Sequence, residues 1–320
     1  MTTAAAVKTV IETRGLEKQF GSVRALDGLD LAVSAGEVHG FLGPNGAGKS
    51  TTIRILLGLA RASGGTATVF GDDPWNAASA LHARIAYVPG DVALWPNLSG
   101  GEAIDLIARL RGNDTRNAEY TTRRRELSEA FQFDPTRKAR AYSKGNRQKV
   151  ALIAALATPA DLYILDEPTS GLDPVMEAVF SREISRLVAA GATVLLSSHI
   201  LSEVERLCDR VSIIRAGKTV ETGTLAEMRH LTRTEISFAV DGRSDTQVAT
   251  IPAVHDVVVA DGRVTFTVDS DAINSLLPRL ASLGVQGLTI APPSLEELFL
   301  RHYGDDIRGS ESSLEKAAAR

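Results

Sequence analysis

The sequence predicts an α/β core built on a mostly parallel sheet, followed by a small α+β domain. Strand-like and helix-like segments alternate between residues 162 and 214, as they do where helices cover a parallel sheet. A glycine-rich loop, residues 43–50, stands between an apolar strand and a helix. Beyond residue 225 this alternation gives way to short strands with Asp-Gly turns, an amphipathic helix over 271–283 and a second helix over 294–303.

These changes divide the chain of 320 residues into three parts. We expect one domain over residues 1–225, a second over 226–303, and a polar tail over 304–320 that is mobile. A hydrophobic content of 44% is enough for a sizeable core in each domain. The length itself favours two domains over one.

The elements of the first domain follow from their apolar periodicity. Short strands are expected over residues 10–33, with turns at Gly15, Gly21 and Gly28. An apolar strand, 37–42, leads through the glycine-rich loop into a helix, 49–59. Later strands are predicted at 66–69, 85–88, 162–165, 193–197 and 211–214, and helices within 101–133 and at 146–157, 174–190 and 200–208.

Composition excludes several classes of protein. The net charge of −4 argues against nucleic acid as the main partner, because phosphate binding needs an excess of Lys and Arg. A single cysteine, Cys208, cannot form an intrachain disulfide, which fits a reducing compartment. Neither a signal peptide nor an apolar run long enough to span a bilayer is expected. Any membrane role must therefore come from a partner.

The glycine-rich loop has the spacing of a phosphate-binding loop. Glycines let several backbone N–H groups curl around a triphosphate, and the helix that follows adds its dipole. Lys49 would place a charge on the β- and γ-phosphates, and Ser50 would offer its hydroxyl to Mg²⁺. The predicted nucleotide-binding residues are Gly43, Pro44, Asn45, Gly46, Ala47, Gly48, Lys49, Ser50 and Thr51.

A second motif supplies acidic side chains at the end of a strand. The apolar run 162–165 ends in Asp166 and Glu167, and a buried strand carries charge there when that end opens on a site. Asp166 would hold Mg²⁺, and Glu167 would orient or deprotonate the attacking water. A strand that merely ends in a polar turn is the alternative for this pair taken alone.

Four motifs in order resemble the nucleotide-binding subunit of an ABC transporter, over about residues 9–225. They are the glycine-rich loop, Tyr142-Ser143-Lys144-Gly145-Asn146-Arg147-Gln148, residues 165–174, and Ser197-Ser198-His199. The resemblance implies a phosphate-loop ATPase core with an N-terminal β subdomain and a helical insert around 95–158. It also implies hydrolysis of ATP with Mg²⁺. The signature and Ser197-Ser198-His199 argue against the alternative of a phosphate-loop kinase or GTPase.

The resemblance assigns further roles residue by residue. It implies that Phe20 stacks on adenine, with a core phenylalanine as the alternative. Ser143 and Gly145 would contact the γ-phosphate held by the opposite subunit, and Asp173 would link the two sites. His199, after an apolar strand, would be the catalytic switch that contacts the γ-phosphate together with Lys49 and Glu167.

Partners are implied in the same way. Two chains, as a homodimer or with a second ABC ATPase, would enclose two ATP molecules and drive a separate multi-spanning membrane permease from the cytoplasmic face. The segment 293–300 resembles the ending of drug and antibiotic exporters with a C-terminal accessory domain. A soluble ABC protein acting on ribosomes or DNA is the alternative, disfavoured by the single cassette. Residues 91–97, with Trp95, are the expected docking surface, although Trp95 could instead be a core residue.

Three places depart from the family pattern or imitate it. Lys144 and Asn146 replace the commoner residues of the signature, and residues 98–102 resemble it but lie too far before Asp166. Gly90 stands where most cassettes have a glutamine that reaches Mg²⁺. Three interpretations remain: Asp91 binds Mg²⁺ through water, water alone fills the position, or the site is slow. We favour Asp91, because a carboxylate suits a hard cation.

Overall fold

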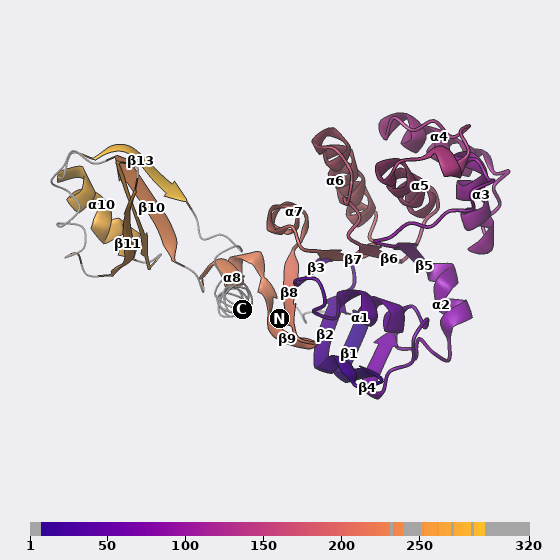
Figure 1. Cartoon of the computed structure of the whole chain (residues 1–320), viewed down its shortest axis with the longest axis horizontal. Coiled ribbons are helices and arrows are strands. Elements are labelled where there is room, and N and C mark those ends of the chain that lie inside the picture. Colours follow the sequence, from indigo (N-terminus) through magenta and orange to yellow (C-terminus); the bar gives the residue numbers. More distant parts are fainter. Residues whose placement is uncertain are drawn as a thin grey trace, which may run out of the picture. The chain divides into compact units, whose positions relative to one another are not determined.

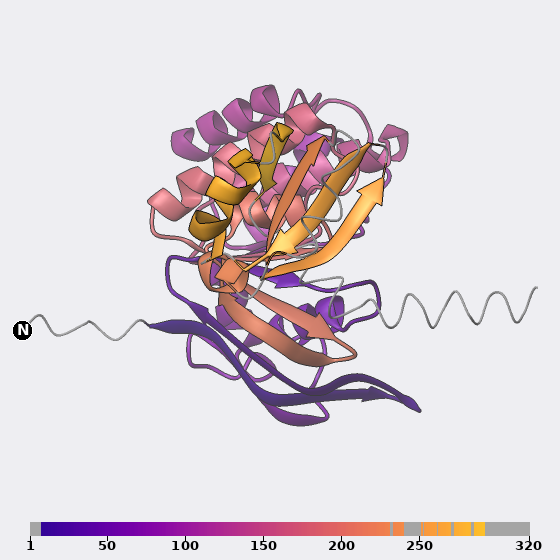
Figure 2. The ribbon, with the colours of Figure 1, turned by 90° about the vertical axis from the view of Figure 1, so that its left-hand side faces the viewer.

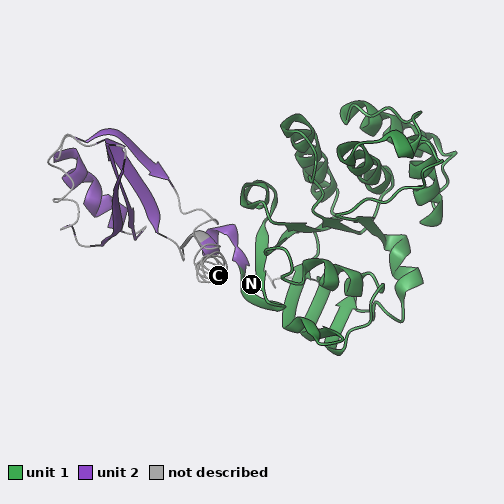
Figure 3. Ribbon diagram, viewed as in Figure 1, with its two compact units in different colours: residues 1–222 green, residues 223–320 purple. Residues whose placement is uncertain are grey.

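The computed structural model describes residues 8–230, 233–239, 251, 253–260, 262–269, 272–282 and 285–291. It divides into two compact units, residues 1–222 and 223–320 (Figure 3). The expected tail, 304–320, and the exporter-like segment, 293–300, lie outside the described residues.

A six-stranded sheet forms the centre of the first unit (Figure 1). Its strand order is β5-β6-β7-β3-β8-β9, and the pairs that join β5, β6, β7, β3 and β8 are parallel. The strands are β3 (Val38–Leu42), β5 (Ile85–Val88), β6 (Leu162–Asp166), β7 (Thr193–Ser198), β8 (Arg210–Arg215) and β9 (Lys218–Thr224). Every residue of β3, β6 and β7 is buried. Because these strands run parallel, their carboxyl ends and the loops that follow lie at one edge of the sheet.

The helices of the first unit begin and end close to the predicted residues, except the helix at Ala78–Arg84, which was not predicted. They are α1 (Lys49–Leu56), α2 (Ala78–Arg84), α3 (Gly100–Leu110), α4 (Ala118–Ala130), α5 (Lys144–Leu156), α6 (Pro174–Ala189) and α7 (Leu201–Leu207), with one turn of 3-10 helix, η1 (Ala139–Ala141). Helices α3 and α4 both pack against α5 and form the expected helical insert (Figure 1). Asn117 caps α4 by accepting the N–H of Glu119, which satisfies a donor that the helix leaves free.

An antiparallel sheet of order β2-β1-β4 completes this unit, and here the prediction of short strands was wrong. The strands β1 (Thr9–Phe20) and β2 (Val23–Ser34) are long, and β4 (Gly64–Val69) pairs with β1. Gly15 and Gly28 lie inside them with φ of +55° and +87°, where the register of β1 on β2 shifts. These glycines are therefore bulges, and only Gly21 lies in a turn.

The second unit begins with residues 223–224 of β9, helix α8 (Leu225–His230) and an antiparallel sheet of order β11-β12-β10-β13. The strands are β10 (Thr234–Ala239), β11 (Val254–Ala260), β12 (Arg263–Val268) and β13 (Gln286–Ala291). Helix α10 (Ile273–Ser282) lies along one face (Figure 2), and its Leu276 and Leu280 pack on Phe238 and Phe266. No described helix of either unit is both long and apolar enough to cross a bilayer.

Candidate nucleotide-binding site

The glycine-rich loop joins the end of β3 to the start of α1 and needs its glycines for physical reasons. A Cβ at Gly43 would lie 2.6 Å from the carbonyl oxygen of Ile214, so a larger residue would displace the backbone. Gly46 and Gly48 have φ of +84° and +115°, which L side chains rarely adopt. The loop thereby curls at the amino end of α1, where the first N–H groups of a helix have no partner within the helix and can bind an anion.

Lys49 is already directed into this loop. Its side chain is only 5% exposed, and Nζ donates to the carbonyl oxygens of Gly43 (2.6 Å) and Pro44 (3.3 Å). Nζ also lies 3.8 Å from Oε1 of Glu167. Burial lowers the pKa of Lys49 below its usual value, and the charges of Glu167 and Asp166 offset only part of this shift. The carbonyls and the carboxylate therefore hold the ammonium group in place where a phosphate would meet it.

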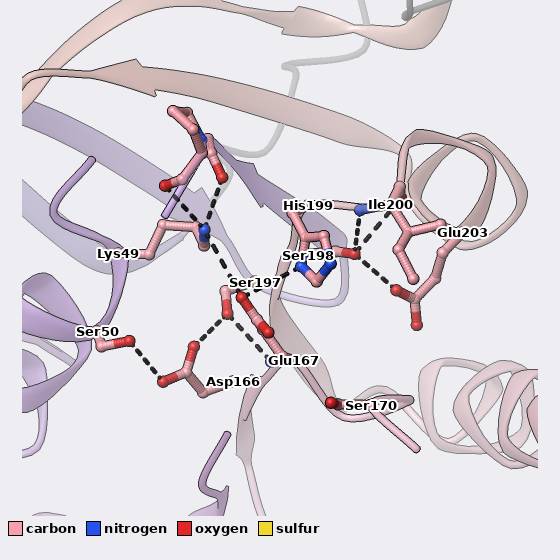
Figure 4. A network of polar contacts seen from close by, with 12 residues as sticks. Lys49, Ser50, Asp166, Glu167, Ser170, Ser197, Ser198, His199, Ile200 and Glu203 are labelled. Carbon is pink, nitrogen blue, oxygen red and sulfur yellow. Dashed lines mark hydrogen bonds and ion pairs between the residues drawn. The ribbon is translucent and has the colours of Figure 1, made fainter. Parts of the chain in front are cut away.

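Asp166 lies at the end of β6, beside the first turn of α1. Its Oδ2 accepts a hydrogen bond from Ser50 Oγ at 3.0 Å, and its Oδ1 accepts one from Ser197 Oγ at 2.5 Å (Figure 4). A carboxylate and a hydroxyl so close together are the hard oxygen ligands that Mg²⁺ prefers. The predicted pair Ser50 and Asp166 thus fits the metal, which would neutralise phosphate charge when bound.

Glu167 and His199 complete the group. Glu167 follows Asp166 in the left-handed region, with φ of +48°. Nδ1 of His199 lies 3.3 Å from Oε1 of Glu167, and the imidazole is about half exposed. The structure therefore brings Lys49, Ser50, Asp166, Glu167 and His199 together at one edge of the sheet (Figure 4).

The segment that carries His199 is held by Glu203, a residue that no sequence motif indicated. Ser198 Oγ donates to Oε2 of Glu203 at 2.7 Å and accepts the N–H of Ile200 at 2.9 Å. Glu203 is buried, and this burial raises the pKa of its carboxyl. Hydrogen bonds from the hydroxyls of Ser198 and Thr169 lower the pKa but do not cancel the effect of burial. Two hydrogen bonds thus brace the turn at His199.

Phe20 is exposed rather than part of the core. Half of its surface is open to solvent at the tip of the hairpin of β1 and β2. Nζ of Lys18 lies 4.7 Å from the ring centroid, a cation–π contact. The core alternative is therefore wrong, and the ring offers a face for stacking.

Ser143, Gly145 and Asp173 lie on other elements of the same unit. Ser143 caps α5 by accepting the N–H of Asn146 (3.3 Å), and Oδ1 of Asp173 caps α6. A Cβ at Gly145 would lie 2.4 Å from the carbonyl oxygen of Gly171, so the signature packs directly on the segment that leads to Asp173. In the part of the chain that the structure describes, no hydrogen bond or ion pair joins these residues to the glycine-rich loop.

Gly90 is a neighbour of the Asp166 carboxylate. A Cβ there would lie 3.4 Å from the backbone oxygen of Asp166 and 3.6 Å from its carboxyl group. Asp91 is exposed, and its side chain makes no hydrogen bond or ion pair within the described ranges. A glutamine side chain at position 90 would therefore start beside Asp166, whereas the side chain of Asp91 would have to turn inward to reach this carboxylate.

The rejected run, residues 98–102, has a structural role. Ser99 caps α3 and exchanges hydrogen bonds with Glu102, so the pair is a capping box. A Cβ at Gly100 would lie 2.4 Å from the ring of Phe133. Upstream of this run, Trp95 is 48% exposed, which contradicts the interpretation as a core residue.

Comparisons with known proteins agree with this geometry. Residues 26–170 match the family described as ABC transporter, and residues 223–303 match the C-terminal domain of proteins like the ATP-binding protein DrrA1-3. The daunorubicin resistance ATP-binding protein DrrA3 of Streptomyces coeruleorubidus is 36% identical, over 95% of this chain and 99% of the relative. This chain is an ABC transporter ATP-binding protein. The family predicted from the ordered motifs is therefore confirmed.

Other relatives extend the comparison. The bacitracin transport ATP-binding protein BcrA of Bacillus licheniformis is 31% identical over 95% of this chain and its whole length. A solved ATP-binding subunit of an ABC transporter is 32% identical, with a TM-score of 0.65 over 70% of this chain and 93% of its own. A dimeric cassette, MJ0796, shares the fold at 22% identity and a TM-score of 0.61, over 67% and 98% of the two chains. The predicted fold class and the predicted ATPase activity are confirmed, and this ABC protein binds ATP.

Proposed function

We propose that this ABC ATPase powers export of drugs or antibiotics through a separate membrane permease with several spanning helices. The relatives named for daunorubicin resistance and bacitracin transport support the class of cargo. The observation that supports the ATPase site is the convergence of two carboxylates, a buried lysine, a hydroxyl and an exposed histidine on one edge of the sheet. We place the protein at the cytoplasmic face of the membrane, held there by the permease.

Each side chain of the site then has a defined task. Lys49 and the loop N–H groups bind the phosphates, Phe20 stacks on adenine, and Ser50 with Asp166 holds Mg²⁺. Glu167 takes a proton from the attacking water or orients it. His199 contacts the γ-phosphate, and its position 3.3 Å from Glu167 lets it steady that carboxylate. Asp91 is proposed to approach Mg²⁺ through water.

The second half of each site comes from another chain. Ser143 and Asp173 are exposed, and Gly145 lies against Gly171. Residues that cap helices and remain open to solvent are available to a partner. We propose a homodimer, or a pair with a second ABC ATPase, in which Ser143 of one chain meets the ATP on the other chain's Lys49. A dimeric cassette is known for the same fold.

The accessory part has a separate role. We propose residues 1–225 as the ATPase domain and 226–303 as an accessory domain that steadies or regulates the dimer. The second unit has its own core around Phe238 and Phe266 and contains none of the nucleotide motifs.

The experiment is a comparison of ATP binding with ATP turnover. Glu167→Gln is expected to bind ATP as the wild type does and to lose most of its turnover, because the amide cannot accept the proton. Lys49→Ala is expected to weaken binding itself. Glu129→Gln, an exposed residue of α4, is the matched control. Steady-state turnover near the wild-type rate in Glu167→Gln would exclude Glu167 as the general base.

The permease is tested by extracting the tagged protein gently from membranes of its own host. A subunit with several spanning helices is expected to co-purify. Replacing the exposed Trp95 by Ala together with Leu94 by Asp is expected to release it. Retention of the subunit by that double variant would remove residues 91–97 as the docking surface.

A further inference from the structure

Ser197 is a fully buried serine at the end of β7, next to both carboxylates of the site. It has no solvent-exposed surface, and it pairs with Asp166 in the parallel register of β6 and β7. A polar side chain in such a place must find hydrogen-bond partners within the protein. Its partners are therefore informative about its role.

The first partner is the side chain of Asp166. Ser197 Oγ donates to Oδ1 at 2.5 Å, while Oδ2 faces Ser50 Oγ at 3.0 Å (Figure 4). A carboxylate with one oxygen held by a buried hydroxyl cannot rotate freely. The other oxygen, on the side of Ser50, is then the one directed to a metal ion.

The second partner is the backbone of Glu167. Its N–H donates to the carbonyl oxygen of Ser197 at 3.1 Å, as the parallel ladder requires, and also to Ser197 Oγ at 3.2 Å. Glu167 has a φ of +48°, a conformation that is unfavourable for a residue with a Cβ. The two acceptors on Ser197 hold this N–H and so stabilise the conformation.

We propose that Ser197 is a positioning residue that fixes the two carboxylates relative to each other: one hydroxyl donates to Asp166 and accepts from the amide of Glu167. The inference rests on the proposed roles of Asp166 and Glu167. It gives this serine a task that neither strand packing nor the switch histidine explains.

The surroundings of Asp166 make this hydroxyl more important. Gly90 also lies beside this carboxylate, and it has no side chain to offer. Among the described residues, only the hydroxyls of Ser50 and Ser197 donate hydrogen bonds to this carboxylate. Because Ser50 is the proposed metal ligand, Ser197 is the one of these two hydroxyls that remains to orient Asp166 when the metal is bound.

The test compares Ser197→Ala with a buried serine outside the site. Ser212 on β8 is equally buried, and its hydroxyl contacts His39 and Thr222, so Ser212→Ala loses a hydroxyl without touching either carboxylate. Ser197→Thr restores the hydroxyl and is expected to recover most of the function. The melting temperature of each nucleotide-free variant verifies that it is folded.

Two measurements distinguish positioning from packing. The first is the affinity for fluorescent MANT-ATP in EDTA and over a titration of Mg²⁺. We expect affinity in EDTA to be unchanged in Ser197→Ala, because Lys49 and its loop are intact, and the half-saturating Mg²⁺ concentration to rise about tenfold. The second is steady-state turnover at saturating Mg²⁺ and ATP, which should fall about tenfold with little change in KM for ATP.

The inference is overturned if Ser197→Ala and Ser212→Ala match within twofold in both measurements. Glu167→Gln, measured in parallel, distinguishes a failure of the role of Ser197 from a failure of the proposed function. If Glu167→Gln is inactive and Ser197→Ala is normal, only the role of Ser197 falls. If Glu167→Gln keeps its turnover, the assignment of the general base falls first.

Discussion

Replacing Gly145 by alanine tests how closely the signature is packed against the segment that leads to Asp173. Two effects oppose each other. Alanine in the first turn of α5 favours the helix by about 1 kcal/mol over glycine. The new Cβ, however, would lie 2.4 Å from the carbonyl oxygen of Gly171, far inside van der Waals contact. Overpacking of this kind costs about 1–3 kcal/mol.

The clash should prevail because its partner is backbone and cannot turn aside. Ser170, next to Gly171, is also held by Nζ of Lys144 at 2.8 Å, and Asp173 is fixed as the cap of α6. We therefore expect Gly145→Ala to lower the free energy of unfolding by about 1 kcal/mol net. Any relaxation must displace the Gly171 segment, so ATP-induced dimerisation should weaken as well.

Urea denaturation of the nucleotide-free protein measures the first effect. Asn146→Ala is the matched control, since it gains helix propensity in the same turn without a clash and should be stabilised by several tenths of a kcal/mol. Dimerisation is measured by light scattering with ATP in the Glu167→Gln background. Gly145→Ala that proved as stable as Asn146→Ala and still formed dimers would refute the close packing.

Two further predictions concern groups beside the site. Burial raises the pKa of Glu203 above its usual value of 4.5, so its charged form destabilises the fold at high pH and its protonated form does not. Glu203→Gln should therefore be more stable than the wild type at pH 8 and lose that advantage below pH 4.5, as followed by melting temperature; a constant difference across pH would contradict it. Asp91→Ala should lower turnover at saturating Mg·ATP about tenfold, and Gly90→Gln in that background should restore part, because a Cβ at 90 meets only ordinary contacts. Unchanged turnover in Asp91→Ala would leave water as the better account of this position.

The parallel sheet and most of its helices could be predicted because their apolar runs are long and end in recognisable residues. The apolar run that ends in Asp166 and Glu167 is one example, and the Pro174 that starts α6 after Asp173 is another. The N-terminal strands were predicted too short because a glycine with positive φ can form either a turn or a bulge. At Gly15 and Gly28 the pairing of two distant segments decides between them.

Other parts of the site depend on contacts between strands that no local pattern contains. The hydroxyl of Ser197 reaches Asp166 only because β6 and β7 are parallel neighbours in a given register. The bracing of His199 by Glu203 likewise depends on how α7 folds back under β7. The choice between Ser143 and Ser99 could be made from spacing, and the structure supplies its physical reason, a capping box at Ser99.

The left-handed backbone at Glu167 places a residue of the proposed catalytic site in a conformation that lowers the stability of the fold. A φ of +48° is comfortable for glycine and tolerable for asparagine, but a side chain as long as glutamate holds it only under restraint. Glycine at this position would relax the backbone and remove the carboxylate in one step. Variants selected only for resistance to heat would thus be expected to lose ATPase activity while they kept the fold. Activity and stability therefore oppose each other at this one residue.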